Sequence, residues 1–183
     1  MSNNTQGNFI IEVTYKNKAY TLGKKERVVE GEAPAVRVKM LNNEVKVIGL
    51  MAPAVQVMIT LNDVNKYSSE IHEIINTAKR KVNAYIITTS NTKQIEDITE
   101  KFALDKAFVS NDFKDFSLKF GVNIDNYMIA NSIFVIDKEG IIKYKEIPTD
   151  LEDTFKIEKF SITLNETVNF KPKGHTHENW MGV

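Results

Sequence analysis

The sequence predicts an α/β fold in which helices cover both faces of a mixed central sheet, with a β-hairpin in front of it. Three observations support this class. The chain has 183 residues, 42% of them hydrophobic, which suits one domain with a substantial core. Apolar residues along its middle switch between strand-like runs and helical spacing of three and four. Strand-rich segments open the chain, a β-α-β-α-β order follows, and a hairpin with a last helix closes it.

Strand signals dominate the first quarter of the chain. Segments 9–15 and 19–22 are rich in β-branched and aromatic residues, and a polar turn separates them, so they predict a hairpin. Segment 35–40 alternates between apolar and polar residues, as a half-buried strand does. The turn signal Asn42-Asn43 leads into a further strand at 45–48.

A strand, a helix and a second strand are predicted next. Segment 55–59 is apolar, and the helix after it presents one apolar face at helical spacing, formed by Tyr67, Ile71, Ile74, Ile75 and Ala78. Asp63 or Asn65 is expected to cap this helix. Segment 84–89 has the continuous apolar run of a central strand that is buried on both faces.

The second half contributes two helices and a short strand before the final hairpin. A helix entered through Ser90 or Thr92 covers 95–102, and segment 107–109 predicts a brief strand. Aromatic residues at spacing three and four then predict a short helix that Gly121 ends. These aromatic residues are Phe113, Phe116 and Phe120.

The chain is expected to close with a hairpin and a helix. Segments 132–137 and 141–144 pair across Lys138-Glu139-Gly140, a good hairpin turn. A last helix should begin near Thr149-Asp150 and carry its apolar face over 157–168. Residues 1–171 therefore form one predicted domain, and 172–183 a tail in which Pro172 and Gly174 break any helix.

Composition narrows the classes of function. Lys plus Arg equals Asp plus Glu at 24 each, so no global field favours a nucleic-acid partner or an anionic membrane. The first seven residues do not resemble a secretory signal, and no apolar run approaches the roughly 20 residues that cross a bilayer. We therefore expect a cytoplasmic protein. The chain has no cysteine, which excludes disulfides and thiolate metal sites.

Short motifs in matching order resemble the thiol peroxidases, the Tpx-type, atypical two-cysteine branch of the peroxiredoxins. That family writes its active-site loop P-S-x-D-T-P-V-C, and here Ile-Thr-Leu-Asn-Asp-Val-Asn-Lys stands at 59–66. Four further stretches match its V-T-x-x-G-x-x-x-T-L, V-G-D-x-A-P-x-F-x-V, A-Y-G-V and V-V-V-I-D-x-x-G motifs, the second being one residue shorter here. They are 13–22, 30–38, 119–122 and 133–140. The resemblance implies a thioredoxin-like fold of peroxiredoxin type and an ancestry in thiol-dependent peroxide reduction.

The residues that differ from the family pattern stand at the positions that carry its catalytic groups. Lys66 stands in place of the reactive cysteine, which in the family lies in a helix's first turn, where orphan N–H groups stabilise a thiolate. Asp63 replaces the threonine that bonds the peroxide, and Ile59 replaces the shielding proline. Asn131 replaces the arginine that pairs with the thiolate, and the resolving cysteine aligns near Thr99. We therefore predict that peroxidase chemistry has been lost, with no catalytic residue of the family type.

Lys66 admits three interpretations. It could form a solvated surface pair with Asp63, which would offset the unfavourable contact of a cation with a helix N-terminus. It could instead form an anion pocket with helix N–H groups and Asn131. A Schiff-base lysine needs a depressed pKa, and the nearby Asp63 argues against that.

The tail holds two of the three histidines and the only tryptophan. His175 and His177 could chelate a metal ion, although two histidines are a weak signal. Trp180 and Met181 could instead anchor the tail in a groove of this or another subunit. His72, beside the apolar helix face, is expected to be structural or on the surface.

The sequence thus predicts a binding or regulatory module without a cofactor. The family resemblance implies a homodimer around the pocket-bearing helix, and a protein partner in thiol redox or stress response, such as an active peroxiredoxin. The competing hypothesis is an enzyme with repurposed chemistry at a Lys66 pocket or at a tail-bound metal. No Gly-rich phosphate loop, Ser-His-Asp order or metal signature supports another enzyme class.

Overall fold

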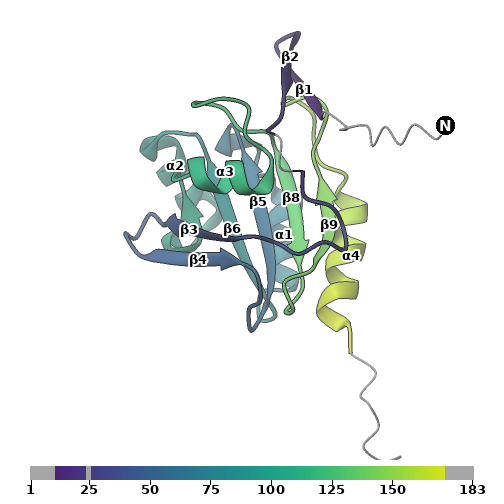
Figure 1. The fold of residues 1–183 in the computed structure, drawn as a ribbon. Coiled ribbons are helices and arrows are strands. Elements are labelled where there is room, and N and C mark those ends of the chain that lie inside the picture. The colour runs from purple at the N-terminus through teal and green to yellow at the C-terminus, as the bar shows by residue number, and fades with distance from the viewer. Residues whose placement is uncertain (1–10, 24–25, 172–183) are drawn as a thin grey trace, which may run out of the picture.

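A five-stranded mixed sheet forms the centre of the fold (Figure 1). The structure is a computed structural model, and it describes residues 11–23 and 26–171. The strand order is β7-β6-β5-β8-β9, in which β5, β6 and β7 run parallel while β8 and β9 are antiparallel to their neighbours. The strands are β5 (Val55–Leu61), β6 (Val82–Thr88), β7 (Val109–Ser110), β8 (Ser132–Ile136) and β9 (Ile142–Glu146). The predicted mixed sheet is confirmed.

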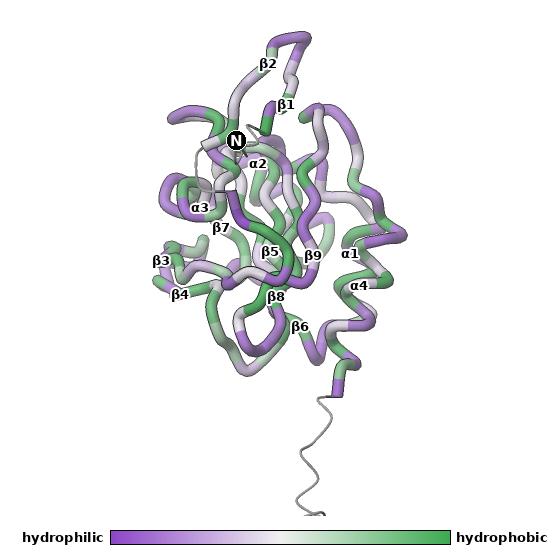
Figure 2. The backbone as a smooth tube through the Cα atoms, turned by 45° about the vertical axis from the view of Figure 1, so that its right-hand side comes forward, coloured by the Kyte–Doolittle hydropathy of each residue, from purple (hydrophilic) through white to green (hydrophobic). Residues whose placement is uncertain are grey.

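Helices cover both faces of this sheet, as the sequence predicts. All residues of β5 are buried, and their side chains alternate between two cores. Ile59 packs into the core beneath three helices, whereas its neighbour Met58 packs into the other core, beneath α3 (Lys114–Phe120). The three helices are α1 (Ser69–Thr77), α2 (Thr92–Phe102) and α4 (Ile157–Asn169). Figure 2 shows the hydrophobic residues concentrated in the central strands.

Two separate antiparallel hairpins accompany the sheet. The first, β1 (Glu12–Tyr15) with β2 (Lys18–Thr21), projects from one end of the molecule (Figure 1). The second pairs β3 (Ala35–Lys39) with β4 (Val45–Gly49). Both hairpins agree with the prediction, although Phe9 and Ile10 lie outside the described residues, as does the predicted tail.

Two predictions for the middle of the chain are wrong, the cap of α2 and the strand at 107–109. Asn91 caps α2 in a capping box with Gln94, so neither Ser90 nor Thr92 is the cap. The predicted strand at 107–109 is a 3₁₀ turn, η2 (Lys106–Phe108), followed by the two-residue β7, because the Asp105 carboxylate accepts the Ala107 N–H and tightens the backbone. The end of α3 at Gly121 is confirmed, with φ at 69°.

The last helix begins later than predicted. It starts at Ile157, whereas segment 149–156 forms a loop with turns. Asp150 explains the difference, because its carboxylate accepts the Glu152 N–H at 2.8 Å and its carbonyl accepts the Asp153 N–H at 3.1 Å. These bonds form a turn that competes with helix. None of the helices in the described ranges is long and apolar enough to cross a membrane.

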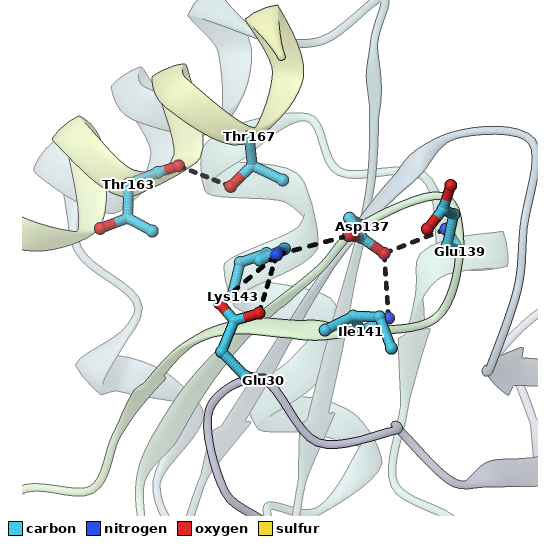
Figure 3. A network of polar contacts seen from close by, with 7 residues as sticks. All are labelled: Glu30, Asp137, Glu139, Ile141, Lys143, Thr163 and Thr167. Atoms are coloured by element: carbon cyan, nitrogen blue, oxygen red, sulfur yellow. Dashed lines mark hydrogen bonds and ion pairs between the residues drawn. The ribbon is translucent and has the colours of Figure 1, made fainter. Parts of the chain in front are cut away.

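A network of exposed ion pairs holds the segment before β3 against the β8–β9 hairpin (Figure 3). Lys143 Nζ lies 3.0 Å from Glu30 and 3.9 Å from Asp137. The Asp137 carboxylate also accepts the N–H groups of Glu139 and Ile141, and so closes the predicted hairpin turn. Exposed ion pairs of this kind contribute little stability, so the structural role of the network lies in the turn that Asp137 closes.

Candidate functional site

The loop that carries Lys66 leaves the carboxyl end of β5 and enters a 3₁₀ turn, η1 (Val64–Lys66). Asp63 caps this turn, with its carboxylate accepting the Asn65 N–H at 3.0 Å. The α-helix starts three residues later, where the Ser68 hydroxyl accepts the Ile71 N–H. The prediction of one helix from Tyr67, capped by Asp63 or Asn65, is therefore wrong. Lys66 lies in the last turn of η1, where a cation is favourable, and not in the first turn of α1.

The Lys66 amine is engaged with the backbone. Its Nζ donates to the Glu152 carbonyl at 3.2 Å. The Asp63 carboxylate accepts instead from the Asn65 backbone and side chain, and no Lys66–Asp63 ion pair occurs within the described part of the chain. The predicted surface pair is thus absent, and Lys66 contacts the loop before α4.

Asn131 contacts the same loop from the other side. It is only 2% exposed, and its Nδ2 donates to the Leu151 carbonyl at 2.9 Å. Its Oδ1 accepts the Asn62 N–H at 2.9 Å, so both ends of the amide are used. Asn131 and Lys66 therefore bind consecutive carbonyls of one loop, those of Leu151 and Glu152 respectively.

Hydrogen bonds among polar side chains complete this end of the sheet. Thr60 donates to the Ala130 carbonyl at 2.8 Å and also contacts the Ser132 hydroxyl. Thr89 donates to the Asn62 carbonyl at 2.6 Å. Because these groups bind one another, they lack the free donors that a peroxide site would need.

Ile59 and Thr99, the other two positions that the resemblance singles out, also have structural contacts. Ile59 is fully buried in β5. Thr99 is 7% exposed within α2, where its hydroxyl donates to the Ile95 carbonyl at 2.7 Å. Neither side chain offers a nucleophile or a redox group.

A small cavity of about 220 Å³ lies beside Lys66. Lys66 and Ser68 line it together with Ile71, Phe155 and Ile157, and the acidic Glu70 and Asp153 lie at it as well. Asn131 does not line this cavity. The predicted convergence of Lys66 and Asn131 on one anion is therefore not formed.

The loop bound by Lys66 and Asn131 also holds the first hairpin. Thr14 N–H donates to the Thr149 carbonyl at 2.7 Å, and the Thr14 hydroxyl donates to the Asp150 carboxylate at 2.6 Å. This hydroxyl, then the Glu152 N–H and the nearby Lys66, lower the pKa of Asp150 below its ordinary value. Sequence reasoning missed this loop, because Thr149-Asp150 has the pattern of a helix start.

Histidine chemistry is confined to one structural contact among the described residues. His72 Nδ1 lies 3.0 Å from the Tyr67 hydroxyl, and its Nε2 lies 2.8 Å from Asn76 Nδ2. Burial raises the pKa of Tyr67. Residues 11–23 and 26–171 contain no cluster of three or more potential His, Asp or Glu metal ligands. His175 and His177 lie outside those ranges, so the tail metal site stays a prediction.

Comparison with solved structures places this geometry in a known fold. A peroxiredoxin-like protein from Aquifex aeolicus superposes with a TM-score of 0.75 at 22% identity, covering 86% of this chain and 97% of that one. A thiol peroxidase from Chromobacterium violaceum gives 0.69 at 14% identity, covering 85% and 96%. A thiol:disulfide interchange protein of the thioredoxin family from Chlorobium tepidum TLS gives 0.56 at 10% identity, covering 78% and 99%.

Sequence comparison alone gives no such link, because no protein-family model and no curated protein matches this chain. At these levels of identity the structural likeness establishes the fold and not the activity. The chain has a thioredoxin-like fold of the peroxiredoxin type, built around a central sheet whose strand ends carry no thiol.

Proposed function

We propose that this chain is a thiol-peroxidase-like protein that has lost peroxidase chemistry and acts as a binding or regulatory module. One observation carries the proposal: the sequence contains no cysteine, and the amine at the family's cysteine position binds a backbone carbonyl. Peroxide reduction in this family proceeds through a thiolate, which no other side chain here can replace.

The hydrogen bonding of the former site supports the same proposal. A peroxide pocket needs donors that are free until the substrate arrives. Here the Asn131 amide makes one hydrogen bond through its nitrogen and one through its oxygen, the Lys66 amine binds a carbonyl, and both side chains hold the loop at 151–152. The polar groups thus serve stability in place of catalysis.

The direct test is peroxide consumption by the purified protein with a thioredoxin system. We expect no turnover above the protein-free background. A matched protein that carries Asp63→Thr, Lys66→Cys and Asn131→Arg tests the mapping of the site, because it should react measurably with peroxide. Robust turnover by the unaltered chain would refute the proposal.

The proposal includes a homodimer around α1 and the loops beside it, and a protein partner in thiol redox or stress response. Cross-linking and size-exclusion with light scattering measure the first. Co-purification with a tagged active peroxiredoxin from the same source, followed by reconstitution from pure components, measures the second.

A second candidate is repurposed chemistry at Lys66, which the cavity beside that residue favours. The cavity combines one cation with two carboxylates, so a small zwitterion suits it better than a simple anion. Titration with free amino acids, observed by NMR, separates the two functions: saturable shifts confined to the residues around Lys66 would favour this candidate.

A further inference from the structure

A hollow of about 900 Å³ lies between α1 and α4, which run side by side (Figure 2). Apolar side chains from both helices line it, and most of them are only half-buried against the core beneath. They include Ile74, Ala78, Leu164 and Val168. Ile162, on its rim, is 51% exposed. Apolar side chains that are open to solvent gain free energy when another apolar group covers them.

One end of the hollow is basic. Lys79, Arg80 and Lys81 follow α1 directly and line the hollow at that end, and all three are exposed. Lys81 Nζ donates to the Asn169 side chain at 3.3 Å. Asn169 is the last residue of α4, so the chain leaves this helix at the basic end of the hollow.

The sequence that follows has a suitable occupant. Trp180 and Met181 are adjacent large apolar residues in a polar stretch, and the acidic Glu178 precedes them by two positions. Trp180 follows Asn169 by 11 residues, which span at most about 36 Å when extended. The nine residues of α1 extend for only about 14 Å, so the segment can return along the hollow.

We propose that segment 178–181 binds in the α1–α4 hollow of its own chain. Because the chain enters at the basic end, Glu178 passes the cations before Trp180 and Met181 reach the apolar floor. Within segment 178–181 the acidic residue thus precedes the apolar ones, as the basic end precedes the apolar floor along the hollow, and Lys171 and Lys173 lie before this segment. This inference does not depend on the loss of peroxidase chemistry.

The test uses Trp180 itself, because the full chain contains a single tryptophan. Its emission maximum and its quenching by acrylamide report whether the indole is covered. We expect emission at short wavelength and weak quenching in the unaltered protein. Ile162→Asp places a charge on the rim, and because Ile162 is exposed the fold tolerates it. This variant should shift the emission toward that of free tryptophan and raise the quenching several-fold.

Leu118→Asp is the matched control, because Leu118 is 54% exposed on α3, over the opposite face of the sheet. It should behave as the unaltered chain does. Arg80→Glu should also shift the emission toward that of free tryptophan and raise the quenching. This variant replaces Ile162→Asp as the test if circular dichroism shows that Ile162→Asp is unfolded. Emission that none of the hollow variants changes, or that depends on protein concentration, as binding to a second copy would, overturns the proposal.

Discussion

Asn131→Ala tests whether the buried Asn131 amide stabilises the fold. The substitution removes two hydrogen bonds, to the Asn62 N–H and to the Leu151 carbonyl, each at 2.9 Å. A net hydrogen bond contributes about 1 kcal/mol, and a buried group left without a partner costs about 1–3 kcal/mol. The Leu151 contact is buried and the Asn62 contact is partly buried, so we expect a loss of about 3 kcal/mol in the free energy of unfolding.

The assay is urea denaturation followed by circular dichroism. With a slope of about 2 kcal/mol/M, the loss lowers the midpoint by about 1.5 M. Asn65→Ala is the control, because this exposed asparagine only bonds the Asp63 side chain beside it, and its loss should stay within about 0.5 kcal/mol. Amide exchange should also rise selectively at Leu151 and Thr14, which the same loop joins. Equal midpoints for the two variants would refute the structural role of Asn131.

Three further predictions concern pH, a helix cap and a turn. The folded-state pKa of Asp150 is lowered, so its stabilising contribution is present above the unfolded value and is lost as pH falls through the folded value. Asp150→Asn should therefore destabilise the protein at pH 7, and the difference in thermal midpoint from the unaltered chain should shrink as the pH falls below the ordinary Asp value of about 3.9. Ser68→Ala removes the cap of α1 and should cost about 1 kcal/mol in urea, whereas the exposed neighbour Ser69→Ala should cost less than half of that. Gly49→Ala forces a residue with a Cβ into a φ of +82° and against the Pro34 carbonyl. Its yield of soluble protein and its thermal midpoint should therefore fall well below those of the control Gly31→Ala, because Gly31 has no such backbone angle.

The spacing of apolar residues predicts the sheet and the helices, because buried positions recur at the characteristic repeat of a strand or a helix. The continuous apolar run at 84–89 falls on β6, and the aromatic spacing of Phe116 and Phe120 falls on α3. Element ends are less predictable, because they depend on single polar groups and their partners. Asn91 rather than Ser90 caps α2 because the Ser90 hydroxyl already accepts the Val64 N–H across the fold. No local pattern could show that contact.

The hydrogen bonds of the candidate site could not be predicted from the sequence. Motif order identifies Lys66 and Asn131, but their partners lie 86 and 20 residues away, in a loop whose sequence reads as a helix start. That loop also holds Thr14 of the first hairpin. Hydrogen bonds over such sequence distances are set by the tertiary fold, which propensity does not encode.

The geometry of this loop agrees with the proposed loss of peroxidase chemistry. A thiolate site is costly to keep, because it requires buried donors and a cation that stay unpaired until a substrate binds. Once the thiol is absent, those unpaired groups lower stability without any return in rate, and substitutions that pair them are stabilising. Lys66 and Asn131 have that character, since each now binds a carbonyl of the same loop. If the loop at 151–152 is their common partner, their contributions are coupled. The double variant Lys66→Met/Asn131→Ala should then lose measurably less free energy of unfolding than the sum of the single losses.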